Sequence, residues 1–174
     1  MPAPLSGGHS GPQQFLRLVG FITLPILILD QLSKLYIARH LALHQDIVLI
    51  PNYLDITYTL NPGAAFSMFA GMPAWFRSSF LLALAAGAIV VLLVLLFRDP
   101  RLNLTSIALA MILAGAIGNL IDRLWRGPVL DFILMHYYGY AWPVFNVADS
   151  AITVGVVLIL LASLKPGDGR PTVD

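Results

Sequence analysis

Cysteine, glutamate and charged side chains in general are scarce in this 174-residue chain. Cysteine is absent, which excludes disulfides, thiol nucleophiles and thiolate metal sites. All nine acidic residues are aspartate. Because glutamate is the better helix former, its absence indicates that little helix surface faces water. The acids are then expected at helix ends, at caps and in sites.

Charged residues make up only 11% of the chain, against about 25% in an ordinary soluble domain. Hydrophobic residues make up 58% and the mean hydropathy is +0.82. The net charge is +1 and the sequence contains no basic run, so nothing indicates a nucleic-acid partner. This composition predicts a small helical membrane protein rather than a soluble domain.

Four apolar stretches are long enough to cross a bilayer, whose hydrocarbon core of about 30 Å needs about 20 residues of helix. They cover roughly residues 15–37, 75–97, 102–122 and 147–164. The first resembles a signal peptide, but Asp30 and Lys34 stand where a small-residue cleavage site is needed, so we expect it to be retained. The predicted fold is an all-α membrane bundle of four helices, forming one domain over residues 15–165. A disordered tail is expected at residues 1–14, and a C-terminal tail at 166–174.

Residues 40–60 have a different pattern. The runs Asp46–Ile50 and Tyr53–Leu60 are rich in β-branched and aromatic residues, and Pro51 and Asn52 between them indicate a turn. Each run is too short to span a bilayer as a helix. We therefore expect a small extramembrane β element on the bilayer surface after the first helix. A later aromatic cluster should lie at the headgroup level; it contains Tyr137, Tyr138, Tyr140 and Trp142.

An even number of spans places both termini on one side of the membrane. The positive-inside rule does not decide which side, because five Lys and Arg residues fall on each. Lys34 and Arg123 can be buried in a site and then carry no topological information. Without them the count favours cytoplasmic termini.

Residues 115–150 hold three of the nine acidic residues. Gly115, Asn119 and Asp122 are spaced i, i+4 and i+7, so they share one face of the third span. Small residues here favour close helix packing. Asn119, Asp122 and Arg123 at the end of that face predict a polar pocket.

Asp30 and Lys34 are four residues apart and can pair on one helix face. One interpretation is an interfacial pair that only anchors the helix end. The other is a structural brace or substrate contact in a site, because an ionisable residue at membrane depth is a functional hypothesis.

Asp131 and Asp149 are the candidate catalytic pair. Asn146 to Asp149 has the form of a capping box, and a helix N-terminus also favours the ionised carboxylate that a general base needs. Asp131 stands among apolar neighbours and needs a partner. If the two carboxyls meet, they share one proton. One can then activate water while the other protonates the carbonyl or leaving group, which hydrolyses an amide without a metal.

Two other chemistries fit less well. His40 and His44 have the i, i+4 spacing of a zinc site, but Leu41 stands where the zincin pattern needs Glu. Ser67 and Ser150 are possible nucleophiles, yet no His is near them in sequence, although His136 could approach in space.

Four ordered blocks of this chain resemble lipoprotein signal peptidase (signal peptidase II), a bacterial intramembrane aspartyl peptidase family. The blocks are Asp30–Lys34, Asn61–Ser67, Gly118–Phe132 and Phe145–Ile152. The resemblance implies that Asp131 and Asp149 are catalytic. It also implies substrate-binding or supporting roles for Asp30, Lys34, Asn61, Gly63, Asn119, Asp122, Arg123 and Asn146.

The resemblance further implies the substrate, namely a prolipoprotein cleaved just before a cysteine that carries diacylglyceryl. No metal or cofactor is implied, and residues 40–60 correspond to the family's periplasmic β-cradle. The family works as an inner-membrane enzyme with cytoplasmic termini and a site that opens to the periplasmic face, and globomycin inhibits it. We expect a monomer whose partners are these substrates and membrane lipid.

One position departs from the family pattern. Pro62 stands where a polar residue such as threonine is expected. Proline removes a backbone donor and stiffens the loop, but it leaves the Asp131–Asp149 pair, here called the dyad, unchanged. Two other functions remain as alternatives. A small transporter or channel component would use Asp30, Asp122, Asp131 and Asp149 as a proton or ion relay. A non-catalytic assembly protein would tolerate Asn at Asp131 or Asp149.

Overall fold

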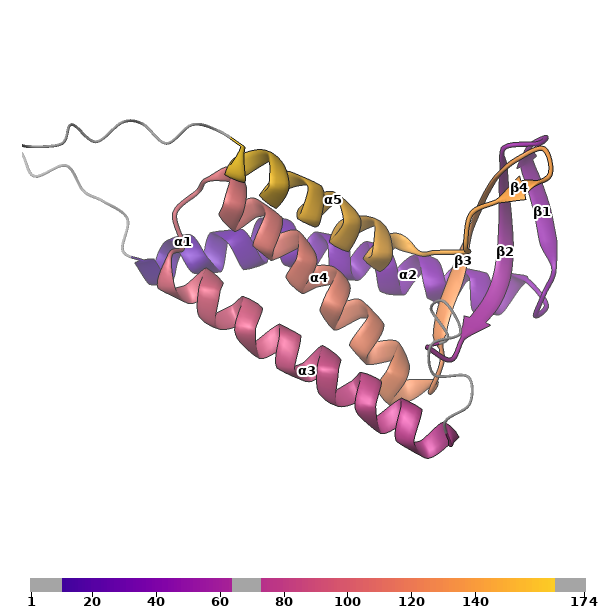
Figure 1. Ribbon diagram of the computed structural model, residues 1–174, viewed down its shortest axis with the longest axis horizontal. Coiled ribbons are helices and arrows are strands. Elements are labelled where there is room, and N and C mark those ends of the chain that lie inside the picture. Colours follow the sequence, from indigo (N-terminus) through magenta and orange to yellow (C-terminus); the bar gives the residue numbers. More distant parts are fainter. Residues whose placement is uncertain (1–10, 64–72, 165–174) are drawn as a thin grey trace, which may run out of the picture.

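A four-helix bundle carries a small β-sheet at one end (Figure 1). The computed structural model describes residues 11–63 and 73–164. The sheet projects from the end of the bundle opposite to the start of α1 and the end of α5 (Figure 1). The predicted fold class, a helical membrane bundle with a small β element, is confirmed.

The first helix is continuous over Gly11–His40. It consists of α1 (Gly11–Leu18), a π-helical turn η1 (Val19–Thr23) and α2 (Leu24–His40). Buried Thr23, at the end of the π turn, donates a hydrogen bond of 3.0 Å to the carbonyl of Ala110 on α4. The helix begins before the predicted start, so the predicted disordered tail is wrong for residues 11–14; residues 1–10 lie outside the described part.

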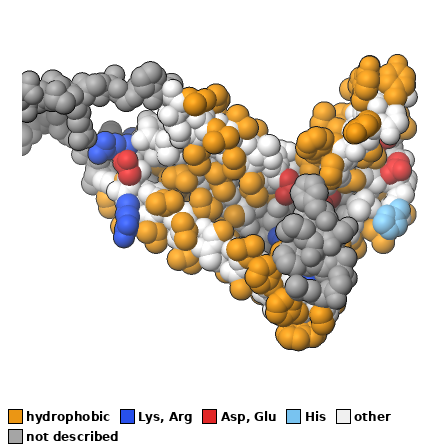
Figure 2. Space-filling model, in the orientation of Figure 1, with side chains coloured by type: hydrophobic (Ala, Val, Ile, Leu, Met, Phe, Trp, Pro, Cys, Tyr) orange, Lys and Arg blue, Asp and Glu red, His pale blue; other side chains and the backbone are white. Residues whose placement is uncertain are grey.

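The other helices are α3 (Ala74–Arg98), α4 (Leu104–Trp125) and α5 (Val147–Ser163). Within the described residues, three helices are long and apolar enough to cross a membrane: Gly11–His40, α3 and α4. The fourth, α5, is apolar but has 17 residues, and this length gives about 26 Å of helix. Hydrophobic side chains cover much of the helix surface in Figure 2, and Lys and Arg gather at the end away from the sheet.

The sheet has four antiparallel strands in the order β1-β2-β3-β4. Strands β1 (Asp46–Ile50) and β2 (Leu54–Asn61) form the hairpin predicted after the first helix, and Asn52 adopts a positive φ of 68° in its turn. Strands β3 (Val129–Tyr137) and β4 (Tyr140–Ala141) come from the segment between α4 and α5. The sequence did not predict β3, because its run is apolar on both faces rather than alternating.

Helix α4 lies at the centre of the bundle and packs against α2, α3 and α5. Its contact with α5 is close, since a Cβ at Gly115 would lie 2.3 Å from the carbonyl oxygen of Ala148. A Cβ at Gly118 would lie 2.5 Å from Asp30 Oδ2 on α2. The predicted packing role of these glycines is confirmed. They let α2, α4 and α5 approach closely next to the polar residues of α4.

Gly115→Ala tests this close packing. The added methyl must push α5 away, because a backbone carbonyl cannot rotate aside, and we expect the free energy of unfolding to fall by about 1–3 kcal/mol. The matched control is Gly87→Ala on α3, where a Cβ would meet nothing within 4 Å. Unfolding in mixed micelles, followed by circular dichroism, compares the two. Equal stability of both variants would contradict the close approach.

Candidate active site

Helix α5 begins with the predicted capping box, which is confirmed. The backbone N–H of Asp149 donates to Asn146 Oδ1 at 2.9 Å, and the backbone N–H of Asn146 donates to Asp149 Oδ2 at 3.3 Å. These bonds satisfy backbone donors that the helix itself leaves unpaired. They also fix the Asp149 carboxylate in the first turn, where the helix dipole favours negative charge.

Asp131 lies on β3, opposite Thr59 of β2, and is only 2% exposed. Both of its carboxyl oxygens accept hydrogen bonds. Asn146 Nδ2 donates to Oδ1 at 2.6 Å, and Asn61 Nδ2 donates to Oδ2 at 3.0 Å. Asn146 therefore contacts Asp131 with its side chain and Asp149 with both side chain and backbone. The two candidate aspartates meet around this one asparagine.

The pKa of Asp131 is raised to about 6, mainly because the carboxyl is buried and secondly because the charge of Asp149 lies near it. Hydrogen bonds from Asn61 and Asn146 and the charge of Lys34 act in the opposite direction but are weaker. Asp131 thus holds a proton readily below about pH 6.

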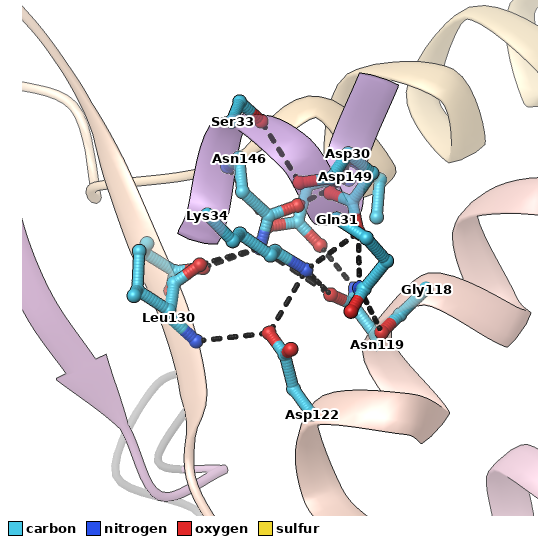
Figure 3. A network of polar contacts seen from close by, with 12 residues as sticks. Asp30, Gln31, Ser33, Lys34, Gly118, Asn119, Asp122, Leu130, Asn146 and Asp149 are labelled. Carbon is cyan, nitrogen blue, oxygen red and sulfur yellow. Dashed lines mark hydrogen bonds and ion pairs between the residues drawn. The ribbon is translucent and has the colours of Figure 1, made fainter. Parts of the chain in front are cut away.

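Behind the dyad lies a fully buried ion-pair network (Figure 3). Lys34 Nζ lies 2.9 Å from both Asp30 Oδ2 and Asp122 Oδ2, with no exposed side-chain surface on any of the three. The predicted pairing of Asp30 with Lys34 is confirmed, and the purely interfacial interpretation is wrong because neither side chain reaches the surface. Asp30 also accepts the backbone N–H of Ala148, and Asp122 accepts that of Leu130.

Of the three residues predicted to form a polar pocket at the end of α4, Asn119 and Arg123 face Asp149, whereas Asp122 pairs with Lys34. Asn119 Nδ2 donates to Asp149 Oδ1 at 2.8 Å. Arg123 donates to the Asn119 carbonyl at 3.2 Å, and its charge is attracted to the carboxylates of Asp149 and Asp131. Asn119 is 8% exposed, whereas Arg123 is half-buried and lines a small cavity of about 120 Å³.

The end of β2 approaches the dyad through Asn61, the last residue of the strand. Gly63 donates its N–H to Asn61 Oδ1 at 2.9 Å and has a positive φ of 91°. A side chain there would collide with Leu81, because a Cβ would lie 2.0 Å from its Cδ1. Pro62 is exposed, and the rest of this predicted block, residues 64–67, lies outside the described part.

Of the alternative nucleophiles and metal ligands, Ser150, His136 and His40 have other partners, and Ser67 lies outside the described residues. Ser150 donates to the Asn146 carbonyl at 2.9 Å, and His136 pairs with Asp55 rather than with a serine. His40 bonds to the carbonyl of Tyr36. Among residues 11–63 and 73–164, no group of three His, Asp or Glu side chains is placed to hold a metal ion.

Comparison with known proteins decides the family. The family model described as signal peptidase (SPase) II matches residues 22–165. The chain belongs to the signal peptidase II family. It is 43% identical to the lipoprotein signal peptidase of Pseudomonas putida, over 95% of this chain and 94% of that one. It is 42% identical to the lipoprotein signal peptidase of Syntrophus aciditrophicus, over 80% of this chain and 88% of that one.

Solved structures agree with this assignment. A bacterial membrane enzyme superposes with a TM-score of 0.77 at 31% identity, covering 92% of this chain and 95% of the other. A second structure described in the same words gives 0.76 at 34% identity, covering 87% and 95%. This signal peptidase II homologue is therefore a peptidase and a multi-pass membrane protein.

In this signal peptidase II homologue, an apolar groove of about 560 Å³ leads to Asp149. Its walls come from the β3–β4 end of the sheet and from α5. The lining residues are Met135, Trp142, Pro143, Val144, Phe145, Asp149, Ser150, Thr153 and Val154. The catalytic candidate Asp149 thus lines a groove whose other walls are mostly apolar.

Two members of the polar network were missed from the sequence. Gln31 donates to Asp30 and to the Gly118 carbonyl, and no sequence signal indicated this contact. Arg126 pairs with Asp122, and their i, i+4 spacing was an available signal.

The raised pKa of Asp131 gives a spectroscopic prediction. Infrared difference spectra should contain a protonated-carboxyl C=O band that titrates near pH 6 and is absent in Asp131→Asn. In Asp149→Asn the band should titrate at lower pH, because the repelling neighbour charge is gone. Asp99→Asn, a change at a well-exposed carboxylate, should leave the band unchanged. A band insensitive to Asp149 would refute the electrostatic coupling of the pair.

Proposed function

We propose that this protein is an aspartyl endopeptidase that removes the signal peptide from diacylglyceryl-modified prolipoproteins, cutting just before the lipid-modified cysteine. The observation that carries the proposal is the joint contact of Asp131 and Asp149 with Asn146. Membership in the signal peptidase II family, and relatives named lipoprotein signal peptidase, support it.

In this mechanism Asp149 is the general base and Asp131 the general acid. Asp149, at a helix N-terminus, takes a proton from water as the water oxygen attacks the scissile carbonyl. Asp131, protonated below about pH 6, gives its proton to the carbonyl oxygen, and a neutral tetrahedral diol forms. Collapse of the diol breaks the C–N bond, while the proton on Asp149 passes to the leaving amine. Asp131 regains its own proton from the second hydroxyl.

The surrounding polar residues divide into two groups by exposure. Asn61, Gly63 and Arg123 are partly exposed, and we assign them to substrate contact. Asp30, Lys34, Asp122 and Asn146 have no exposed surface, and Asn119 has little, so we assign these to support of the dyad. This chemistry requires no metal or cofactor, because the two carboxyls supply both proton transfers.

The apolar groove supports a substrate that carries lipid. Exposed Val154 on α5, at 46% exposure, lies both on the groove and on the helix surface that faces a bilayer. When the scissile bond lies at Asp149, an acyl chain on the neighbouring cysteine can lie along the groove and reach the surrounding lipid without crossing water. Desolvation of that chain contributes to binding in proportion to its buried area.

The arrangement of charges in the membrane supports the remaining assignments. We assign the protein to a bacterial inner membrane, with cytoplasmic termini and the sheet on the periplasmic face. Arg98 and Arg101 stand between α3 and α4, at the end of the bundle opposite to the sheet, as the positive-inside rule requires for that orientation. A monomer suffices, because one chain supplies both aspartates. Inhibitors of the globomycin type are expected to act at the dyad.

The transporter alternative is not favoured. A proton relay needs acids spread through the membrane depth. Asp30, Asp122, Asp131 and Asp149 instead form one connected network through Lys34, Asn119 and Asn146, next to the sheet. Their grouping suits a single reaction site.

The proposed function is tested with purified protein in detergent and two precursors, one diacylglyceryl-modified and one unmodified. We expect only the modified precursor to be shortened on a gel. Asp131→Asn and Asp149→Asn should be inert although folded, and Asp99→Asn should cleave normally, since Asp99 pairs with Arg101 on the surface away from the site. Cleavage by either dyad variant would favour the non-catalytic interpretation of these residues. A wild-type protein that cleaves neither precursor would contradict the proposed function itself.

The groove is tested by filling it. Val154→Trp should raise KM for the lipid-modified precursor several-fold with little change in kcat, because the ring occupies space proposed for an acyl chain. Val94→Trp is the matched control: Val94 is 43% exposed and borders another apolar hollow on the helices, away from the dyad. Equal effects of the two tryptophans would show that the groove has no special role.

A further inference from the structure

The three asparagines around the dyad share one arrangement. In each, the side-chain carbonyl oxygen accepts a hydrogen bond from a group that can only donate, and the NH₂ donates to a carboxylate oxygen of the dyad. Asn61 Oδ1 accepts from the N–H of Gly63, Asn146 Oδ1 accepts from the N–H of Asp149, and Asn119 Oδ1 accepts from Lys34 Nζ at 3.1 Å. These donors determine which way round each amide lies.

As a result, all four carboxyl oxygens of the dyad accept an N–H from an asparagine. Asp131 accepts from the side chains of Asn146 and Asn61, and Asp149 accepts from the side chain of Asn119 and the backbone of Asn146. The shared proton must therefore occupy a lone pair that points away from the asparagines.

Only Asn119 depends on a side chain for its orientation, because the other two asparagines are fixed by backbone N–H groups. Lys34 has three ammonium protons and three oxygen partners at 2.9–3.1 Å: Asp30, Asp122 and Asn119. Its side chain has no exposed surface, so neither substrate nor water competes for these protons. Figure 3 shows the Lys34 nitrogen between these partners.

We propose that Lys34 is a positioning residue that fixes the Asn119 amide, so that its NH₂ donates to Asp149 and its oxygen accepts from Asn146. The inference rests on the proposed peptidase function and assigns Lys34 a role within it. Without the ammonium, the Asn119 oxygen loses its charged donor, and the amide is free to rotate away from the Asp149 carboxylate, which then loses the Asn119 N–H. Asn146 Nδ2 then also loses its acceptor on Asn119, at present 3.3 Å away.

The charged groups near Asp149 come from each element packed against it. Asp131 on β3 and Arg123 on α4 interact with it directly. Asp30 and Lys34 on α2, with Asp122 and Arg126 on α4, form the network behind Asn119.

Lys34→Met tests the proposal, with cleavage of the lipid-modified precursor measured from pH 4 to pH 9. We expect kcat to fall about 10- to 100-fold, as for the loss of one hydrogen bond to a charged group. KM should stay within about twofold, because Lys34 does not reach substrate. The acid limb of kcat/KM should move to higher pH, because an ionised carboxylate of the pair has lost a hydrogen-bond donor.

Asp122→Asn is the matched control. It removes the same Lys34–Asp122 ion pair but leaves the Lys34–Asn119 hydrogen bond in place. The melting temperature should fall, while the acid limb should not move to higher pH, because the loss of a nearby negative charge cannot raise the pKa of a carboxyl. A residue that only braces the helices would give the same pH profile in Lys34→Met and Asp122→Asn.

The double variant Lys34→Met/Asp122→Asn covers the case in which Lys34→Met does not fold, because it removes one positive and one negative buried charge together. A low kcat with a shifted acid limb in the folded double variant supports the proposal. A wild-type acid limb with kcat within twofold overturns it. Failure of the wild type to cleave would instead count against the proposed function.

Discussion

The buried contact between Lys34, Asp30 and Asp122 holds the active-site end of the molecule together. Asp30 and Lys34 come from α2 and Asp122 from α4. The two carboxylates also bond to other elements. Asp30 accepts the N–H of Ala148 on α5 with its other oxygen, and Asp122 accepts that of Leu130 on β3 with the same oxygen that pairs with Lys34. One ammonium thus links both elements that carry the proposed catalytic aspartates, and a shift of any of the four elements would disturb the pair.

Burying these charges is costly, and the gain in stability over an apolar replacement is small or negative. The network is therefore better understood as a device for geometry than for stability. Each charged oxygen and each ammonium proton has a partner, so one arrangement is strongly preferred over others. The close approach of the helices at Gly115 and Gly118 makes the network possible, because a methyl at either position would displace Ala148 or Asp30. Packing and polar chemistry here depend on the same few residues.

Much of the site could be predicted from local sequence. The spacing of Asp30 and Lys34, the shared face of Gly115, Asn119 and Asp122, and the capping box at Asn146 follow from helix geometry over a few residues. The resemblance to signal peptidase II came from four such blocks, and the comparisons confirm the family. Strand β3 was not predicted, since Val129–Tyr137 is apolar on both sides and lacks the alternation that marks a half-buried strand.

The sequence by itself determined the membrane helices, the β1–β2 hairpin and the helix cap at Asn146, because each depends on residues close together in the chain. Only the tertiary structure decided that Asp131 and Asp149 meet around Asn146, that Asn61 reaches Asp131 across 70 positions, and that Lys34 reaches Asn119 across 85. These contacts depend on how β2, β3 and three helices pack, and no local pattern encodes that packing. The direction of each amide was likewise decided by the folded chain, because it is set by which donor lies opposite the oxygen.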